Sequence, residues 1–325
     1  MASLGRKVRH DLGYWSLKVV LAGSRLLPLP ILRGLGWLAG RAALPLARRD
    51  RGRALAHIAR AFPEHDEAWR RTLVRRCAGH LGTVLGEVAW LWSAPPEAVL
   101  AKTVFVGLEP LTGGLRPDRG AILVTAHCGN WEWLGLGLGA LGIAMTAAAK
   151  EVYDPRLDEV ARRLRGRFGG ETALRGKGAG GKLVQAIRNG RVDGLLIDQD
   201  IDAPGVYVDF FGQPAWTPTG AALLALRTRC PVVAGFATRL PDGRMRLSFS
   251  PPIHAEPGAD LDTDVARLTA ILTAHIERQV RRHPEQWVWM HRRWKHQPGE
   301  GETVWRADHD GPETGEVPAS GSSLG

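Results

Sequence analysis

The chain has 325 residues, enough for one large domain or two small ones with a substantial buried core. Hydrophobic residues make up 44% and charged residues 23%, which are globular values and exclude wholesale disorder. The formal net charge of +10 suits nucleic acid, anionic lipid or a phosphorylated substrate, and does not choose among them.

The N-terminal region is apolar but interrupted. Residues 11–47 are rich in Leu, Val, Ala and Gly, yet Lys, Arg and Pro recur, so no stretch reaches the ~20 apolar residues that a spanning helix needs. Four arginines follow between residues 48 and 53, and could meet anionic lipid. We therefore expect residues 1–50 to be an amphipathic helical region that associates with a membrane surface. The alternative is a helical hairpin packed on the protein's own core.

The remainder alternates helical and strand patterns. Residues 67–93 have the apolar spacing of one amphipathic helix. Short apolar runs at 121–125, 194–197 and 231–237 indicate buried strands, and helical patterns lie between them. Thr217 and Pro218 look like an N-cap and the first residue of a helix, and a long helix is predicted over 262–282.

These patterns predict an α/β fold. The sheet is expected to be mixed and largely parallel, with helices flanking it, in a domain over residues 51–297. Residues 298–325 are rich in Gly, Pro, Ser and Glu without periodicity, and are predicted to be a disordered tail.

The segment AILVTAHCGNWEW, residues 121–133, carries the most chemical information. A buried strand leads directly into His127, where α/β proteins place ligands. Glu132 follows at a spacing that allows contact only if His127 is on a turn and Glu132 is in the next helix. A carboxylate on an imidazole makes a general base that can activate a hydroxyl for acyl transfer. The adjacent Cys128 is a weaker nucleophile candidate, because its side chain should point away from the imidazole.

Four segments, in order, resemble the lipid A biosynthesis acyltransferase family of the glycerolipid acyltransferase superfamily. They are ARAFPEH at 59–65, HCGNWEW at 127–133, DQDIDAPGVYVDFFGQPAWTPTG at 198–220 and HPEQWVWMHRRWK at 283–295. The resemblance runs from about residue 10 to 297, with one departure at Cys128, where Phe is common.

The resemblance implies an activity and its partners. Members transfer a fatty acyl chain from acyl carrier protein to a hydroxyl of a phosphorylated glucosamine lipid, at the cytoplasmic face of the inner membrane. It implies His127 and Glu132 as the catalytic pair. The thioester supplies its own activation, so we expect no cofactor and no metal.

Three further residues are predicted to bind substrate. Arg175 sits in a glycine-rich turn before a helix, where it could bind phosphate or the developing oxyanion, and it matches a family arginine. Asp200, in the D-x-D sequence with Asp198, is expected to orient Arg175 or contact substrate. Asn130 is expected to contribute from the turn beside His127.

Other functions remain possible at this point. A related acyltransferase could act on another glycolipid, such as a phosphatidylinositol mannoside. The D-x-D pair could instead serve a metal-dependent glycosyltransferase, or the chain could be a membrane-binding protein without catalytic activity. Aromatic and basic residues alternate in HPEQWVWMHRRWK, but no nucleic-acid-binding signature accompanies them, so we expect no nucleic acid partner.

Overall fold

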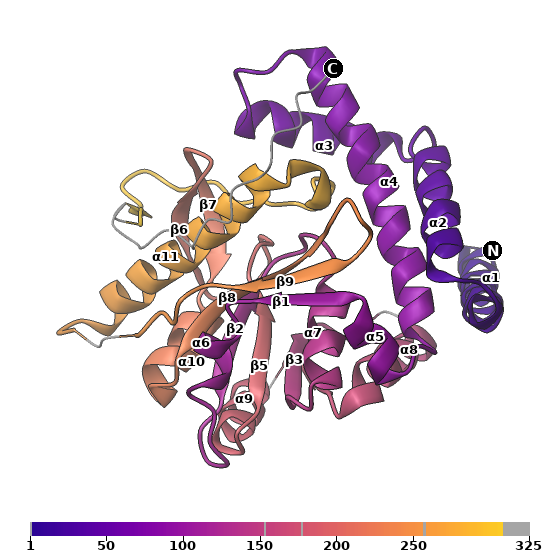
Figure 1. Ribbon diagram of the computed structural model, residues 1–325. Helices are drawn as coiled ribbons and strands as arrows, with labels where there is room; N and C mark the ends of the chain where they lie inside the picture. Colours follow the sequence, from indigo (N-terminus) through magenta and orange to yellow (C-terminus); the bar gives the residue numbers. More distant parts are fainter. Residues whose placement is uncertain (1, 153, 177, 256–257, 308–325) are drawn as a thin grey trace.

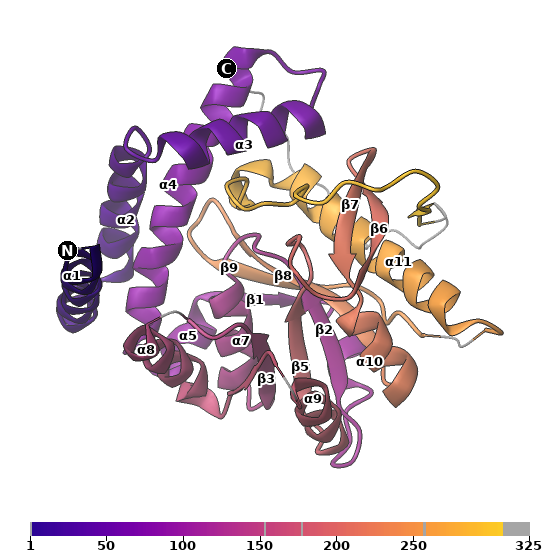
Figure 2. The same ribbon diagram turned by 180° about the vertical axis from the view of Figure 1, so that it is seen from behind.

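A seven-stranded sheet with helices on both faces forms the centre of the protein, seen from two sides in Figures 1 and 2. The computed structural model describes residues 2–152, 154–176, 178–255 and 258–307. The strands of this sheet are β1 (Thr103–Val106), β2 (Ala121–Thr125), β3 (Met145–Ala149), β4 (Glu171–Leu174), β5 (Val192–Leu196), β8 (Val232–Arg239) and β9 (Met245–Phe249).

The strand order is β1-β9-β8-β2-β5-β3-β4, and only the β8–β9 pair is antiparallel. The expected mixed, largely parallel sheet is therefore confirmed. Strand β2 is buried along its whole length, and the predicted β5 and β8 lie on either side of it. Strands covered on both faces are mostly apolar, and each of these three contains a short apolar run that could be located from sequence.

Helices cover both faces of the sheet. Their bounds are α3 (Arg48–Ala61), α4 (Glu67–Leu91), α5 (Pro96–Ala101), α6 (Glu109–Thr112), α7 (Trp131–Ala140), α8 (Pro155–Arg165), α9 (Ala179–Arg188), α10 (Gly220–Thr228) and α11 (Leu261–Arg282). The predicted helices at 67–93 and 262–282 are confirmed as α4 and α11. Each begins at an aspartate N-cap, Asp66 and Asp260, whose carboxylate accepts a backbone N–H of the first turn.

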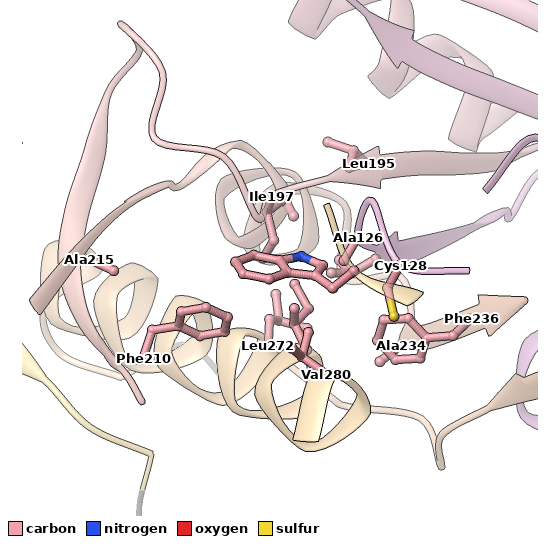
Figure 3. Close-up of a cluster of buried hydrophobic side chains, with 14 of the residues drawn as sticks. Ala126, Cys128, Leu195, Ile197, Phe210, Ala215, Ala234, Phe236, Leu272 and Val280 are labelled. Carbon is pink, nitrogen blue, oxygen red and sulfur yellow. The ribbon is translucent and has the colours of Figure 1, made fainter. Parts of the chain in front are cut away.

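The larger apolar core lies between the sheet and α9, α10 and α11. It joins alternate residues of β2 and β5 to the inner face of α11, as Figure 3 shows for Ile197, Leu272 and Val280. Cys128 lies in the same cluster, with its sulfur toward Phe236. A second cluster on the opposite face of the sheet packs against α5 and α7.

A small second sheet differs from the sequence-based expectation. Strands β6 (Gly205–Phe210) and β7 (Gln213–Pro218) form a hairpin, and β10 (Val304–Trp305) adds to β6 in parallel. Thr217 and Pro218 therefore end a strand, and α10 begins at Gly220 after an N-cap at Thr219. The predicted tail is likewise wrong at residues 304–305, while its last part, 308–325, lies outside the described residues.

The N-terminal region forms α1 (Ala2–Gly23), a 3-10 turn (Ser24–Leu26) and α2 (Leu29–Ala43). Helix α2 runs beside α4 (Figures 1 and 2) along a seam of small residues: a Cβ on Gly36 would lie 2.1 Å from Gly82 O, and one on Gly82 would lie 1.9 Å from Gly36 O. The hairpin is thus packed on the rest of the protein. It also exposes several large apolar side chains, namely Trp15, Val19, Val20, Leu26, Ile31, Leu35, Trp37 and Leu38. Among the described residues, no helix combines the length and apolarity needed to cross a bilayer.

Candidate active site

The turn after β2 is held in one conformation by the surrounding protein. Gly129 has φ +67°, and a Cβ there would lie 1.7 Å from Ala237 O, so only glycine fits. Gly129 N donates to Gln286 O at 2.8 Å, and Asn130 N donates to Ala237 O at 3.0 Å. The backbone that presents His127 is therefore fixed by strand β8 and by the segment after α11.

The carboxylate that contacts His127 is Asp198. Asp198 Oδ1 lies 2.8 Å from His127 Nδ1, and Asp198 Oδ2 accepts the backbone N–H of His127 at 2.8 Å. The contact follows from sheet register: Thr125 pairs with Leu196, and the same parallel register two residues further brings His127 opposite Asp198. The imidazole is about one quarter exposed and the carboxylate is fully buried. Among the described residues, Nε2 of His127 has no hydrogen-bond partner.

Two other groups surround the same carboxylate. Trp287 Nε1 donates to Asp198 Oδ2 at 2.9 Å, and His291 Nε2 lies 3.6 Å from that oxygen. Burial alone would raise the pKa of Asp198, but His127 and His291 outweigh it and hold the pKa well below its usual range. The side chain is therefore ionised beside the imidazole.

Glu132 has a different partner from the one expected. It lies in the first turn of α7, as predicted, but its carboxylate forms a bidentate ion pair with Arg165 at the end of α8, with Nη2–Oε1 at 2.5 Å and Nε–Oε2 at 3.0 Å. Within the described part of the chain, no hydrogen bond joins Glu132 to His127. The predicted direct His127–Glu132 contact is therefore replaced by His127–Asp198, because Asp198 emerges on the neighbouring strand and Glu132 points toward α8.

An apolar pocket of about 80 Å³ opens beside this ion pair. Its lining combines one face of β2 and β5 with β3 and the start of α7, including Leu123, Thr125, Trp131, Leu134, Met145, Ala147, Gly194 and Leu196, and it is completed by Glu132 and Arg165. Trp131 connects the pocket to the dyad, because its ring centroid lies 5.0 Å from that of His127. The site thus places a candidate base next to a pocket suited to a hydrocarbon chain.

Asn130 is part of the framework and does not face the pocket. Its side chain is fully buried: Oδ1 accepts from Trp133 N at 2.9 Å as the N-cap of α7, and Nδ2 donates to Glu87 Oε2 at 2.8 Å. Both ends of the amide are used inside the protein. The prediction that Asn130 binds substrate is therefore not supported by its position.

Glu87, near the C-terminal end of α4, joins Asn130 to two arginines. Arg239 binds both of its carboxylate oxygens, with Nε–Oε1 at 2.6 Å and Nη2–Oε2 at 2.8 Å, and Arg33 Nε donates to Oε1 at 2.8 Å. His80, two turns earlier on α4, contacts Arg239 Nη1 and Gly129 O. Burial, with Arg239 adding to it, lowers the pKa of His80 to about 3, so the ring is neutral. Helix α4 thus supports the catalytic turn at two points.

Arg175 and Asp200 are not brought together. Asp200 accepts from the backbone N–H of His296 at 2.7 Å and from its Nδ1 at 2.5 Å, so its buried carboxylate anchors the segment after residue 293. Arg175 follows β4 at the same sheet edge as His127. The residue is exposed, partial burial lowers the pKa of its guanidinium, and no hydrogen bond or ion pair joins that group to another of the described residues. Asp200 therefore does not orient Arg175, while Arg175 keeps its donors free for a ligand.

Two alternatives raised by the sequence, a Cys128 nucleophile and a metal at the D-x-D pair, receive little support from the positions of the described residues. Burial raises the pKa of Cys128 far above its ordinary value, and Figure 3 places the sulfur in the core, so its thiol is not available as a nucleophile. Asp198 and Asp200 of the D-x-D sequence each hold a histidine. Within the described ranges, no group of three or more His, Cys, Asp or Glu side chains is arranged to bind a metal.

Sequence reasoning missed Asp198 as the partner of His127, and Arg165 and Glu87 altogether. A signal for Asp198 was present, because polar residues that directly follow two buried parallel strands meet at one sheet edge. Arg165 lies among several arginines of α8, and Glu87 lies within an apolar helix pattern. The sequence around Arg165 and Glu87 therefore does not indicate which residue each of them contacts.

Comparison with known proteins agrees with these features. The family model described as bacterial lipid A biosynthesis acyltransferase matches residues 4–296. A lipid A biosynthesis lauroyltransferase of Escherichia coli K12 is 28% identical over 277 residues, covering 84% of this chain and 88% of that protein. A lipid A biosynthesis myristoyltransferase of the same organism is 29% identical over 305 residues, covering 91% of each. A phosphatidylinositol mannoside acyltransferase of Mycobacterium tuberculosis is 29% identical over 198 residues, covering 59% of this chain and 60% of that protein.

Proposed function

The chain belongs to the bacterial lipid A biosynthesis acyltransferase family, and we propose that it transfers a fatty acyl chain from acyl carrier protein to a hydroxyl of a lipid A precursor. The observation that carries this proposal is the His127–Asp198 pair beside an apolar pocket. The relatives that match over most of their length are named for lipid A biosynthesis, whereas the phosphatidylinositol mannoside enzyme matches over a shorter segment. We therefore propose a lipid A precursor, and not a phosphatidylinositol mannoside, as the acceptor.

His127 acts as the general base in this proposal. Its Nε2 removes the proton of the acceptor hydroxyl while the hydroxyl oxygen attacks the thioester carbonyl. The ionised Asp198 at Nδ1 fixes the tautomer and stabilises the imidazolium. When the tetrahedral intermediate collapses, the C–S bond breaks and His127 returns the proton to the leaving thiolate. The thioester is already activated, so no metal or cofactor is required.

The apolar pocket is proposed to receive the acyl chain. Trp131 lines it and packs against His127, so a chain in the pocket would place its thioester near the base. Glu132 and Arg165 form the polar part of the pocket wall. In this proposal Glu132 therefore belongs to the acyl-binding pocket and is not the partner of His127.

Acceptor and membrane contacts complete the proposal. Arg175, exposed at the carboxyl edge of the sheet, is proposed to bind a phosphate of the acceptor. The exposed apolar side chains of α1 and α2, followed by arginines at 48 and 49, are proposed to lie on the cytoplasmic face of the inner membrane. The net charge of +10 suits both the acidic carrier and the anionic lipid.

The test uses the purified chain with acyl carrier protein loaded with a fatty acid and a lipid A precursor, and mass spectrometry reads the acylated lipid. We expect transfer that persists in EDTA, is abolished in His127→Ala, and is kept in His65→Ala, whose ring is exposed and distant in the sequence. Near-normal turnover by His127→Ala would reject the mechanism. Failure of the wild-type chain to acylate any lipid A precursor would reject the acceptor.

A further inference from the structure

We propose that Trp287 and His291 are positioning residues that hold Asp198 in place and limit the basicity of His127. This inference rests on the proposed role of His127 as the general base. It gives a function to the HPEQWVWMHRRWK segment, whose alternation of aromatic and basic residues the acyl-transfer chemistry leaves unexplained.

The segment contacts the catalytic turn along its backbone. Gly129 N donates to Gln286 O at 2.8 Å, and Val288 N donates to His127 O at 3.1 Å. Residues 286–288 therefore lie beside residues 127–129 like a short added strand. This contact brings the side chain of Trp287 to the far side of Asp198 from the imidazole.

Trp287 supplies a directed donor to a carboxylate with no access to water. Its ring is fully buried, and Nε1 donates to Asp198 Oδ2 at 2.9 Å, while Oδ1 faces His127 Nδ1. With the backbone N–H of His127 also on Oδ2, each carboxylate oxygen has a fixed partner. The indole N–H thus sets the rotation of the carboxylate about its own axis, which decides where Oδ1 meets the imidazole.

His291 adds a second imidazole to the same carboxylate. Its Nε2 lies 3.6 Å from Asp198 Oδ2, beyond hydrogen-bonding distance, and its ring packs edge-on against Trp287 at 4.7 Å between centroids. Burial lowers the pKa of His291, and the attraction of Asp198 only partly offsets this, so the ring is neutral in the resting site. A neutral ring whose polar Nε2 edge is directed at Oδ2 stabilises the negative carboxylate by its dipole and not by a full charge.

Among the described residues, the charged or titratable neighbours of Asp198 include four groups. His127 comes from the turn after β2, Cys128 from the same turn, and His291 and Arg293 from the segment after α11. Arg293 is fully buried and donates to Trp216 O and Thr217 Oγ1, so it acts on Asp198 only through space. Among the described residues, Trp287 and His127 are therefore the two whose side chains donate a hydrogen bond to this carboxylate.

Removing the indole N–H should raise the basicity of His127. A carboxylate with one fewer donor keeps more negative charge on its oxygens and holds the imidazolium more strongly. More of the enzyme would then carry a protonated His127 at a given pH and would lack the base. The acid limb of the pH–rate profile is expected to move to higher pH, and the loosened carboxylate should slow the chemical step.

The experiment compares two tryptophans two residues apart. Trp287→Phe and Trp289→Phe each remove one indole N–H from a fully buried ring, but Trp289 Nε1 donates to Pro284 O and does not touch Asp198. For Trp287→Phe we expect kcat to fall by up to about tenfold and KM to stay within about twofold of the wild-type value. The acid limb of its pH–rate profile should move up by about half a pH unit. Trp289→Phe should keep the wild-type limb and a kcat within about threefold.

Equal kcat values and equal acid limbs in the two folded variants would overturn the inference. If Trp287→Phe does not fold by circular dichroism, His291→Phe decides: an upward shift of the acid limb supports the proposal, and an unchanged limb rejects it. Active His127→Ala would instead reject the proposed function. Inactive His127→Ala together with a Trp287→Phe variant that behaves like Trp289→Phe would reject this inference alone.

Discussion

Glu132 and Arg165 face each other across the pocket wall, with the guanidinium bound to both carboxylate oxygens. The two residues come from the first turn of α7 and the last turn of α8, and their side chains are only 14% and 26% exposed. Arg165 therefore neutralises a carboxylate that would otherwise stand beside an apolar surface.

Arg165→Ala should lower both stability and acyl transfer. An unpaired carboxylate at a mostly buried position is expected to cost about 2 kcal/mol, and the pocket wall is left with the uncompensated negative charge of Glu132. Arg163→Ala is the matched control, because its ion pair with Glu159 on the same helix is mostly exposed and is worth at most about 0.5 kcal/mol. Urea unfolding and transfer rates measure both effects, and indistinguishable variants would contradict the importance of the pair.

The α2–α4 seam predicts opposite effects for two neighbouring glycines. Gly36→Ala places a Cβ 2.1 Å from Gly82 O and must push the helices apart. We therefore expect the free energy of unfolding to fall by ~1–3 kcal/mol, the usual cost of overpacking. Gly34→Ala meets no atom within 4 Å and should gain about 0.5–1 kcal/mol from helix propensity. Thermal unfolding compares them, and a stabilising Gly36→Ala would show that the seam is loose.

Glu87→Gln should destabilise the protein strongly. Burial would raise the pKa of Glu87, but Arg239, Arg33 and Asn130 outweigh it, so the buried carboxylate is ionised and balances two guanidinium groups. Replacing it with a neutral amide leaves those charges uncompensated, at a cost of about 3 kcal/mol.

Glu67→Gln is the control for Glu87→Gln on the same helix. Its pair with Arg71 is exposed, so we expect a change within about 0.5 kcal/mol. The free energy of unfolding in urea separates the two variants. Similar small losses in both would mean that the Glu87 network contributes little.

Asp193 predicts a pH dependence of stability. Its carboxylate lies buried on β5 without a hydrogen-bond partner among the described residues, and burial raises its pKa to about 8. Because the unfolded chain ionises near pH 4, the folded state binds an extra proton between these values, and this group makes unfolding easier as pH rises. Below about pH 4 the effect vanishes, and above about pH 8 it is constant.

The variant Asp193→Asn removes that titration. Its stability relative to the wild type should therefore increase from pH 5 to pH 7.5, by at most about 3 kcal/mol, since each pH unit contributes about 1.4 kcal/mol. Unfolding curves at several pH values test this. A difference that does not change with pH would show that Asp193 does not carry the proton.

The framework of the fold could be predicted from sequence because its elements have strong local signals. Strand β2 is a continuous apolar run, and helix α11 has a clear helical periodicity. The hairpin β6–β7 was missed because its strands are half-exposed, and Thr217–Pro218 resembles a helix start although the helix begins two residues later, with Thr219 as N-cap and Gly220 as first residue. Local spacing also favoured Glu132 as the partner of His127, whereas the true contact depends on which strand lies beside β2. That order is a property of the whole sheet.

The close approach of α2 and α4 has a mechanical consequence. The backbones of the two helices are in contact at Gly36 and Gly82, so neither helix can rotate or shift without a steric clash. The two helices are therefore expected to move as one rigid unit. Arg33 on α2 also donates to Glu87 on α4, and Glu87 accepts from Asn130, three residues after His127. A change in the tilt of this helix pair would therefore act on the turn that carries the imidazole.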